Sequence, residues 1–184
     1  MPYKAIIFDF FGVISSEVAP LWFRAHFSPE KTEHLKDEYI KDADRGMIPE
    51  KELMEKLAKL SKTTPSEIER DWFLRAVINQ DVVKEIKRLK KNYKIGLCSN
   101  AVSSFLRTIL KKNNLEKLFD AIIISSEVKL AKPDQEIYNT VLKALSVEPK
   151  DAFMIDDVPE YIEAAEKLGI NGLAFKSVEQ LKLL

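Results

Sequence analysis

The sequence lacks the features that mark several classes of protein. Cys98 is its only cysteine among 184 residues, which excludes a disulfide framework and a cysteine-rich zinc site. Neither sign of charge is in excess, because 29 Lys and Arg balance 29 Asp and Glu, so we expect no nucleic-acid partner. No apolar run approaches the ~20 residues of a membrane span, and the run that ends at Asp9 is too short for a signal peptide. We therefore expect a cytoplasmic protein without a membrane partner, and the sequence leaves its oligomeric state open.

The chain does contain enough apolar residues for a large core, at 46% hydrophobic and 32% charged. Several short apolar runs rich in β-branched residues predict strands that are buried on both faces of a parallel sheet. These runs are Tyr3–Phe8, Tyr93–Cys98, Ala121–Ile124, Ala152–Ile155 and Gly172–Phe175. Segments with apolar residues at helical spacing lie between the later runs. This alternation predicts an α/β fold with a Rossmann-like, doubly wound parallel sheet of about five strands.

Residues 15–79 interrupt the alternation, because they contain no convincing buried strand. They are typical of helices instead, and the predicted helices are Pro29–Asp44, Glu50–Leu60 and Pro65–Ala76. Thr64 and Glu67 form a capping-box pattern at the start of the third. We therefore predict two domains, an α/β core of residues 1–14 and 80–184 and a helical cap inserted at 15–79. A helical block in this place suggests a lid over the carboxyl ends of the strands, where open α/β folds bind ligands.

Polar side chains follow the predicted strands at the point where each strand ends. They are Asp9, Ser99 with Asn100, Lys132 and Asp156 with Asp157. In a parallel sheet these strand ends share one edge, so we expect the side chains to converge on one site. A carboxylate such as Asp9 can attack an electrophile, and Asp9 with Asp157 can hold Mg²⁺. Ser99 and Lys132 can bind phosphate oxygens, although Ser99 and Asn100 can also cap a helix that begins at Ala101.

The segments FDFFGVI, LCSNA, KPDQEIY and MIDDVPEYIEAAEKLGI occur in this order. Together they resemble the four motifs of the haloacid dehalogenase (HAD) superfamily, in its phosphatase-like branch, and the resemblance covers essentially the whole chain. The 15–79 insertion is similar to the small helical C1-type cap of that superfamily. The resemblance implies a sheet with the strand order 5-4-1-2-3.

The resemblance also implies roles for the strand-end residues. Asp9 would be the nucleophile, Ser99 with Asn100 would bind the transferring group, and Lys132 would balance the charge. The implied Mg²⁺ ligands are Asp9, Asp157 and the backbone carbonyl of Phe11, with Asp156 in support, directly or through water. The expected activity is Mg²⁺-dependent hydrolysis of small phosphorylated metabolites through an aspartyl-phosphate.

Two positions depart from the phosphatase pattern. Phe11 stands where phosphatases of the superfamily carry a second Asp, the general acid and base, so we expect slow turnover. Tyr161 stands where an acidic or amide residue is usual. Phe11 and Tyr138 are similar to the dehalogenases, whose last motif lacks the acidic pair. Two alternatives therefore stay open, a catalytically weakened protein that binds a phosphate ligand or a partner, and a metal-independent 2-haloacid dehalogenase.

Overall fold

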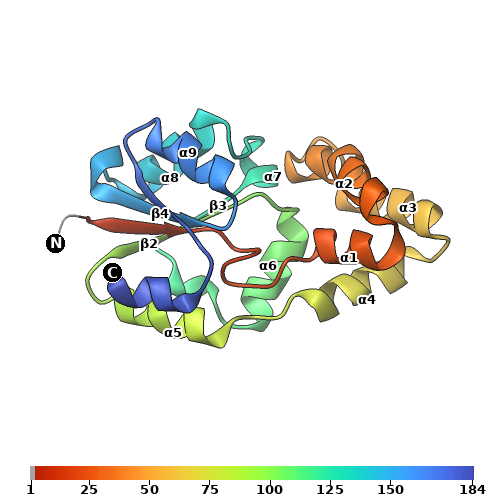
Figure 1. Cartoon of the computed structure of the whole chain (residues 1–184), viewed down its shortest axis with the longest axis horizontal. Helices are drawn as coiled ribbons and strands as arrows, with labels where there is room; N and C mark the ends of the chain where they lie inside the picture. The colour runs from red at the N-terminus through yellow and green to blue at the C-terminus, as the bar shows by residue number, and fades with distance from the viewer. Residues whose placement is uncertain (1–2) are drawn as a thin grey trace.

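The computed structural model describes residues 3–184, apart from the side chains of residues 33, 36 and 37. A parallel sheet with helices on both faces lies beside a separate block of helices (Figure 1). The strands are β1 Ala5–Phe8, β2 Lys94–Ser99, β3 Ala121–Ile124, β4 Ala152–Asp156 and β5 Asn171–Ala174. All neighbouring strands are parallel, in the order β3-β2-β1-β4-β5. This confirms the predicted order, and the strand limits differ from the prediction by about a residue or two.

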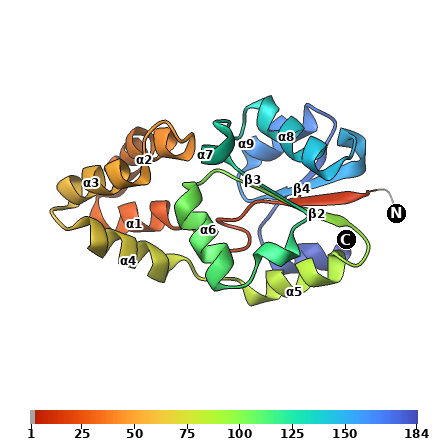
Figure 2. The same ribbon diagram turned by 180° about the vertical axis from the view of Figure 1, so that it is seen from behind.

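Helices cover both faces of the sheet (Figure 2). The core helices are α5 Gln80–Leu89, α6 Ser103–Lys112, α7 Ser125–Val128, α8 Gln135–Leu145 and α9 Pro159–Glu166, and the short 3₁₀ helices are η1 Glu116–Leu118, η2 Pro149–Asp151 and η3 Val178–Leu183. Ile6 and Phe8 of β1 pack in one apolar cluster with α5 and α6, whereas Ala5 and Ile7 pack with α8 and α9. Successive side chains of a strand point to opposite faces, so a strand covered on both faces must be apolar throughout.

The separate block, named the cap here, consists of α1 Ala19–His26, α2 Pro29–Asp44, α3 Glu50–Ser61 and α4 Pro65–Arg75. Helices α2 to α4 confirm the three predicted helices. The predicted capping box is also present, since the Thr64 N–H donates to Glu67 Oε2 at 2.9 Å and the Glu67 N–H donates to Thr64 Oγ1 at 3.3 Å. Helix α1 was not predicted, because its short apolar sequence shows no clear helical alternation. The domain limits at residues 15 and 79 stay a prediction.

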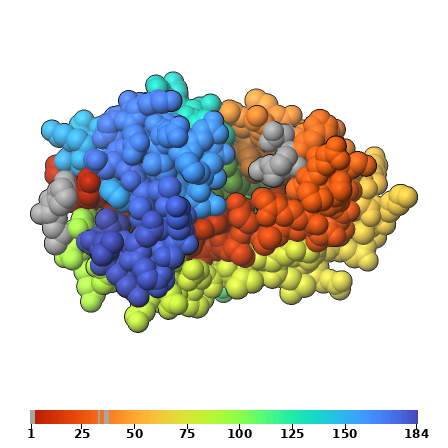
Figure 3. Space-filling view, in the orientation of Figure 1, coloured from red at the N-terminus to blue at the C-terminus, as the bar shows by residue number. Residues whose placement is uncertain are grey.

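The cap lies beyond the carboxyl ends of the strands, next to the edge of the sheet where the polar motifs end. Figure 3 shows the surface hollowed between the core and the cap. Two chain segments join these parts, and they are paired with each other through an antiparallel bridge between Ser15 and Ile78. None of the helices in residues 3–184 is long and apolar enough to cross a membrane.

Candidate active site

The turn that follows β1 builds one wall of the site. Asp9 comes directly after the strand, and its N–H still donates to the Ile155 carbonyl of β4 at 2.9 Å. The chain then turns at Gly12, whose φ of +88° is a conformation that side chains disfavour. A Cβ at Gly12 would also collide with the Asp157 carboxyl group. This close approach of the Gly12 backbone to the Asp157 side chain brings Asp9 and Asp157 into the same pocket.

Lys132 lies at the centre of the buried charges. Its Nζ donates to Asp9 Oδ1 at 2.8 Å and to Asp156 Oδ2 at 2.5 Å, and its side chain is only 1% exposed. Asn100 fixes the loop that carries this lysine. The Lys132 N–H donates to Asn100 Oδ1 at 2.8 Å, and Asn100 Nδ2 donates back to the Lys132 carbonyl at 2.9 Å. Residues from β1, β2, β4 and the loop after α7 therefore meet, as expected for the carboxyl ends of a parallel sheet.

Burial is the largest single influence on the pKa values of Asp9, Lys132 and Asp157. It raises the pKa of Asp9 to about 7, against the opposing charge of Lys132 and with a further increase from Asp156. Burial alone would lower the pKa of Lys132, but Asp156 and Asp9 hold it well above its usual value. Burial, and then the charge of Asp156, also raise the pKa of Asp157. Three carboxylate groups lie near a single ammonium group here. The cluster can therefore bind an additional positive charge, such as a metal ion.

The donor set fits Mg²⁺. Oxygen atoms of Asp9, Asp156 and Asp157 all lie within 4.8 Å of one another. Asp157 Oδ1 is buried and has no hydrogen-bond partner in the described part of the chain. Asp156 is already engaged, because its Oδ2 accepts from Lys132 and its Oδ1 accepts from the Val158 N–H at 3.0 Å. Carboxylate oxygens are the ligands that Mg²⁺ prefers, so Asp9 and Asp157 can hold it while Asp156 mainly positions Lys132.

Ser99 supplies a hydroxyl at the end of β2. Its Oγ is fully buried and has no hydrogen-bond partner among the described residues, which is costly unless a ligand satisfies it. The expectation that Ser99 and Asn100 cap a helix is wrong, because α6 begins at Ser103 with Val102 as its N-cap. Ala101 is not helical, and its N–H donates to Ser125 Oγ at 2.9 Å instead. The Ser99 hydroxyl therefore has no capping role.

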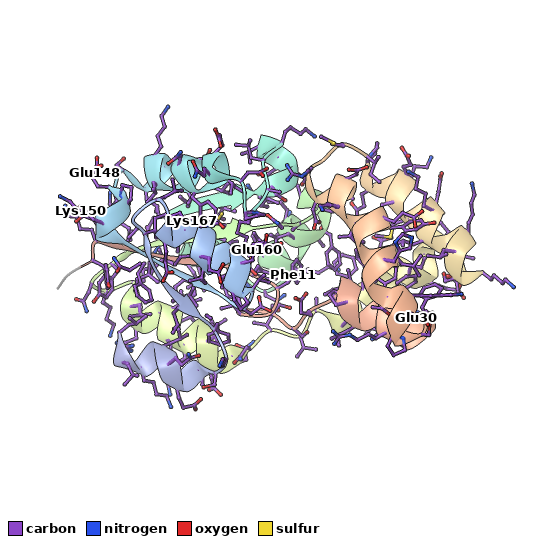
Figure 4. All side chains as sticks on the ribbon, turned by 45° about the horizontal axis from the view of Figure 1, so that its top comes forward. Phe11, Glu30, Glu148, Lys150, Glu160 and Lys167 are labelled. Atoms are coloured by element: carbon purple, nitrogen blue, oxygen red, sulfur yellow. The ribbon has the colours of Figure 1, made fainter. Side chains whose placement is uncertain are left out.

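The pocket lies between the core and the cap and has a volume of about 160 Å³. The core side contributes Asp9, Phe11, Asn100, Phe105, Lys132, Asp157 and Tyr161, and the cap side contributes, among others, Ile40, Leu53 and Trp72. Figure 4 labels Phe11 at the boundary of the two parts. The Phe11 ring stacks against Phe105 with centroids 6.1 Å apart. Sequence patterns could not single out the cap residues of the pocket, because they have the helical spacing of ordinary core residues.

The chain resembles one curated phosphatase over most of its length and a curated dehalogenase over half of its length. It is 31% identical over 180 residues to the phosphorylated carbohydrates phosphatase of Thermotoga maritima, an alignment that covers 91% of this chain and 82% of that protein. It is 26% identical over 92 residues to (S)-2-haloacid dehalogenase 4A of Burkholderia cepacia, which covers 50% of this chain and 40% of the relative.

A HAD family enzyme of Bacteroides thetaiotaomicron has a similar solved structure, with a TM-score of 0.81 at 23% identity over 96% of this chain and 95% of that one. The same enzyme has been crystallised with magnesium and inorganic phosphate, and that complex has a TM-score of 0.79. Residues 3–169 match the family described as haloacid dehalogenase-like hydrolase. The length of this match and the identity to the Thermotoga enzyme show that the chain belongs to the haloacid dehalogenase-like hydrolases, as a phosphatase-like member.

Proposed function

We propose that this protein is a Mg²⁺-dependent hydrolase of small phosphorylated metabolites that works through an aspartyl-phosphate at Asp9. The observation that carries the proposal is the 2.8 Å contact between Asp9 and buried Lys132, in a pocket that Asp157 also lines. The name of the Thermotoga relative and the magnesium and phosphate complex of the Bacteroides enzyme support the same chemistry.

The proposed reaction has two displacements at phosphorus. A carboxylate oxygen of Asp9 attacks the phosphorus atom, and the bond between phosphorus and the alcohol oxygen breaks. Water then attacks the aspartyl-phosphate, which releases phosphate and restores the Asp9 carboxylate. Lys132 balances the charge near Asp9 in both steps, and Ser99 and Asn100 bind the phosphoryl oxygens.

The metal would be held by Asp9, Asp157 and the backbone carbonyl of Phe11, with Asp156 in support. When bound, Mg²⁺ supplies positive charge beside the phosphoryl oxygens. Phe11 has no proton to exchange, and a positioned general acid and base contributes about 10²–10⁴-fold to a rate. We therefore expect slow turnover, and the slowest turnover for alkyl phosphates, whose leaving alcohols need a proton.

The first test is Asp9→Asn, assayed with acetyl phosphate and 4-nitrophenyl phosphate in the presence and absence of Mg²⁺. We expect at least about a 10³-fold loss of activity, because an amide cannot attack phosphorus but occupies the same volume. Asp151→Asn is the matched control, since the Asp151 carboxylate pairs with Lys4 at 2.6 Å and is not among the residues that line the pocket. Activity that survives Asp9→Asn in a folded protein would show that the nucleophile is another group.

Further assays on the same protein samples distinguish this function from two alternatives, a catalytically weakened binding protein and a metal-independent 2-haloacid dehalogenase. A catalytically weakened binding protein would show no Mg²⁺-dependent turnover of either phosphate while still binding inorganic phosphate or tungstate in a calorimeter. A dehalogenase would release halide from 2-haloacids in the presence of a chelator.

A further inference from the structure

Tyr161 adds a further polar side chain to the pocket, beside the proposed catalytic and metal-binding residues. It lies in the first turn of α9 and lines the pocket together with Asp9, Phe11 and Lys132. Its ring covers Lys132 Nζ, which is 5.1 Å from the ring centroid. The side chain therefore lies over the buried ammonium group and lines the pocket between the core and the cap.

The proton of the Tyr161 hydroxyl is available to a ligand. Asn100 Nδ2 approaches Tyr161 Oη as a donor at 3.5 Å, the outer limit of a hydrogen bond, so Oη is the acceptor of that contact. Asn100 is itself fixed by its reciprocal bonds to the Lys132 backbone. No residue in the described part of the chain accepts a hydrogen bond from Tyr161 Oη.

We propose that the Tyr161 hydroxyl is a catalytic proton donor to the leaving oxygen, in the role that Phe11 cannot fill. This rests on the proposed phosphatase function. As Asp9 attacks, the bond between phosphorus and the leaving oxygen breaks, and that oxygen keeps the electron pair and takes the Tyr161 proton. In the second displacement the attacking water gives a proton to the tyrosinate, and the Asp9 carboxylate leaves. Both groups then return to their starting states.

The charges around Tyr161 are consistent with this role. Burial raises the pKa of Tyr161, and the charge of Lys132 opposes that shift less strongly. The hydroxyl is therefore protonated throughout the neutral range, and the Lys132 ammonium lies close enough to stabilise a tyrosinate. A phenol is a weaker acid than a carboxylic acid, so its contribution should be smaller than that of the Asp in related phosphatases.

The test is Tyr161→Phe, which keeps the ring over Lys132 and removes only the hydroxyl. Its kcat/KM is measured with Mg²⁺ across 4-nitrophenyl phosphate, phenyl phosphate and glycerol phosphate. We expect a loss of at least about 10-fold for glycerol phosphate and less than about 3-fold for 4-nitrophenyl phosphate, whose leaving group needs little proton transfer. The rate should thus depend more steeply on the pKa of the leaving group.

Tyr138→Phe is the matched control. The Tyr138 hydroxyl donates to the Tyr161 carbonyl at 2.8 Å and supports the same turn, but Tyr138 does not line the pocket. We expect any loss in Tyr138→Phe to be the same for all three substrates. A second variant, Phe11→Asp combined with Tyr161→Phe, should recover at least part of the lost glycerol phosphate activity.

An equal loss for all substrates in Tyr161→Phe, or no loss, would overturn the role of Tyr161. Neither result would affect the proposed function, provided that Mg²⁺-dependent turnover of 4-nitrophenyl phosphate still requires Asp9. Absence of that turnover in the unmodified protein would overturn both proposals.

Discussion

Phe11 occupies a position where one side chain alters the expected chemistry of the whole site. Its ring contacts Phe10, with centroids 5.0 Å apart, and stacks on Phe105. The residue is half-buried and lines the pocket. It therefore gives the pocket an apolar wall at the position where the proposed mechanism would call for a general acid.

Replacing Phe11 by Asp should increase activity. We expect Phe11→Asp to raise turnover of glycerol phosphate by about 10-fold or more, and that of 4-nitrophenyl phosphate much less, because only the alkyl leaving group needs a proton. The change should lower the free energy of unfolding by about 1–3 kcal/mol if the new carboxyl group lacks a partner. Steady-state kinetics and thermal melts measure both effects. Phe11→Leu is the control, since it removes the ring without adding an acid and should give no gain.

A folded Phe11→Asp protein that gains nothing on any phosphate ester would contradict this account of the site.

The turn after β1 is the element on which the site geometry depends most. Gly12 lies at φ +88° against the Asp157 carboxyl group, so both its backbone conformation and its missing side chain matter. Gly169 provides a control that separates the effect of backbone conformation from the effect of the missing side chain. Its φ of +85° is similar, but the nearest atom to a Cβ there is Pro149 Cβ at 3.8 Å, which is ordinary contact.

We expect Gly12→Ala to impair both stability and metal binding. Backbone strain should cost about 1–2 kcal/mol of unfolding free energy in Gly12→Ala and in the control, Gly169→Ala. Only Gly12→Ala should also displace Asp157, which should weaken Mg²⁺ binding in calorimetry by at least about 10-fold. Equal Mg²⁺ affinities in the two variants would mean that Asp157 is not a ligand or that it tolerates displacement.

At the scale of the whole molecule, the cap contacts the core in several regions. One is the pair of linkers, bridged between Ser15 and Ile78. Another is the contact of Phe73 in α4 with Phe105 in α6, with ring centroids 4.7 Å apart. In a third region, Arg45 Nη1 at the end of α2 binds Asp134 Oδ2 at 2.7 Å, and Lys129 Nζ donates to the Gly46 carbonyl at 2.5 Å. The cap is therefore tied to the loop that contains Lys132 as well as to α6 and to its own linkers.

Removing the Arg45–Asp134 pair should loosen the cap without unfolding the protein. The pair is partly exposed, so Arg45→Ala should lower stability by less than about 1 kcal/mol. Amide hydrogen exchange at residues 44–47 should increase by about 3-fold or more, because these amides lie at the freed contact. Lys56→Ala is the control, since it breaks a pair with Glu52 inside α3, at 2.8 Å, and should leave residues 44–47 unchanged.

The hydrogen bond from Arg45 is the main cause of the lowered pKa of Asp134. The folded-state pKa lies below the unfolded value of about 3.9, so the contact is fully present above that pH and is lost only as the pH falls through the lower folded-state value. Unchanged exchange in Arg45→Ala at neutral pH would show that the remaining contacts suffice to hold the cap. The cytoplasmic location stays a prediction from the sequence.

Local sequence determined most of the elements and the position of the candidate site residues along them. Apolar runs such as Ile6 to Phe8 specify strands covered on both faces, and the Thr64–Glu67 pattern specifies a helix start, because both depend on neighbouring residues. The order of the motifs predicted the family. Since parallel strands end at one edge, the motif pattern also predicted that Asp9, Lys132 and Asp157 would meet there.

Only the tertiary structure decided which contacts the side chains make at that edge of the sheet. Asp156 binds Lys132, Asn100 fixes the lysine loop, Trp72 of the cap lines the pocket, and Tyr161 covers the buried ammonium group. Each of these contacts joins residues far apart in the chain, and its geometry depends on how helices and strands pack. A helical stripe has the same periodicity whether it faces a core or a ligand pocket, so the sequence pattern alone could not distinguish the two.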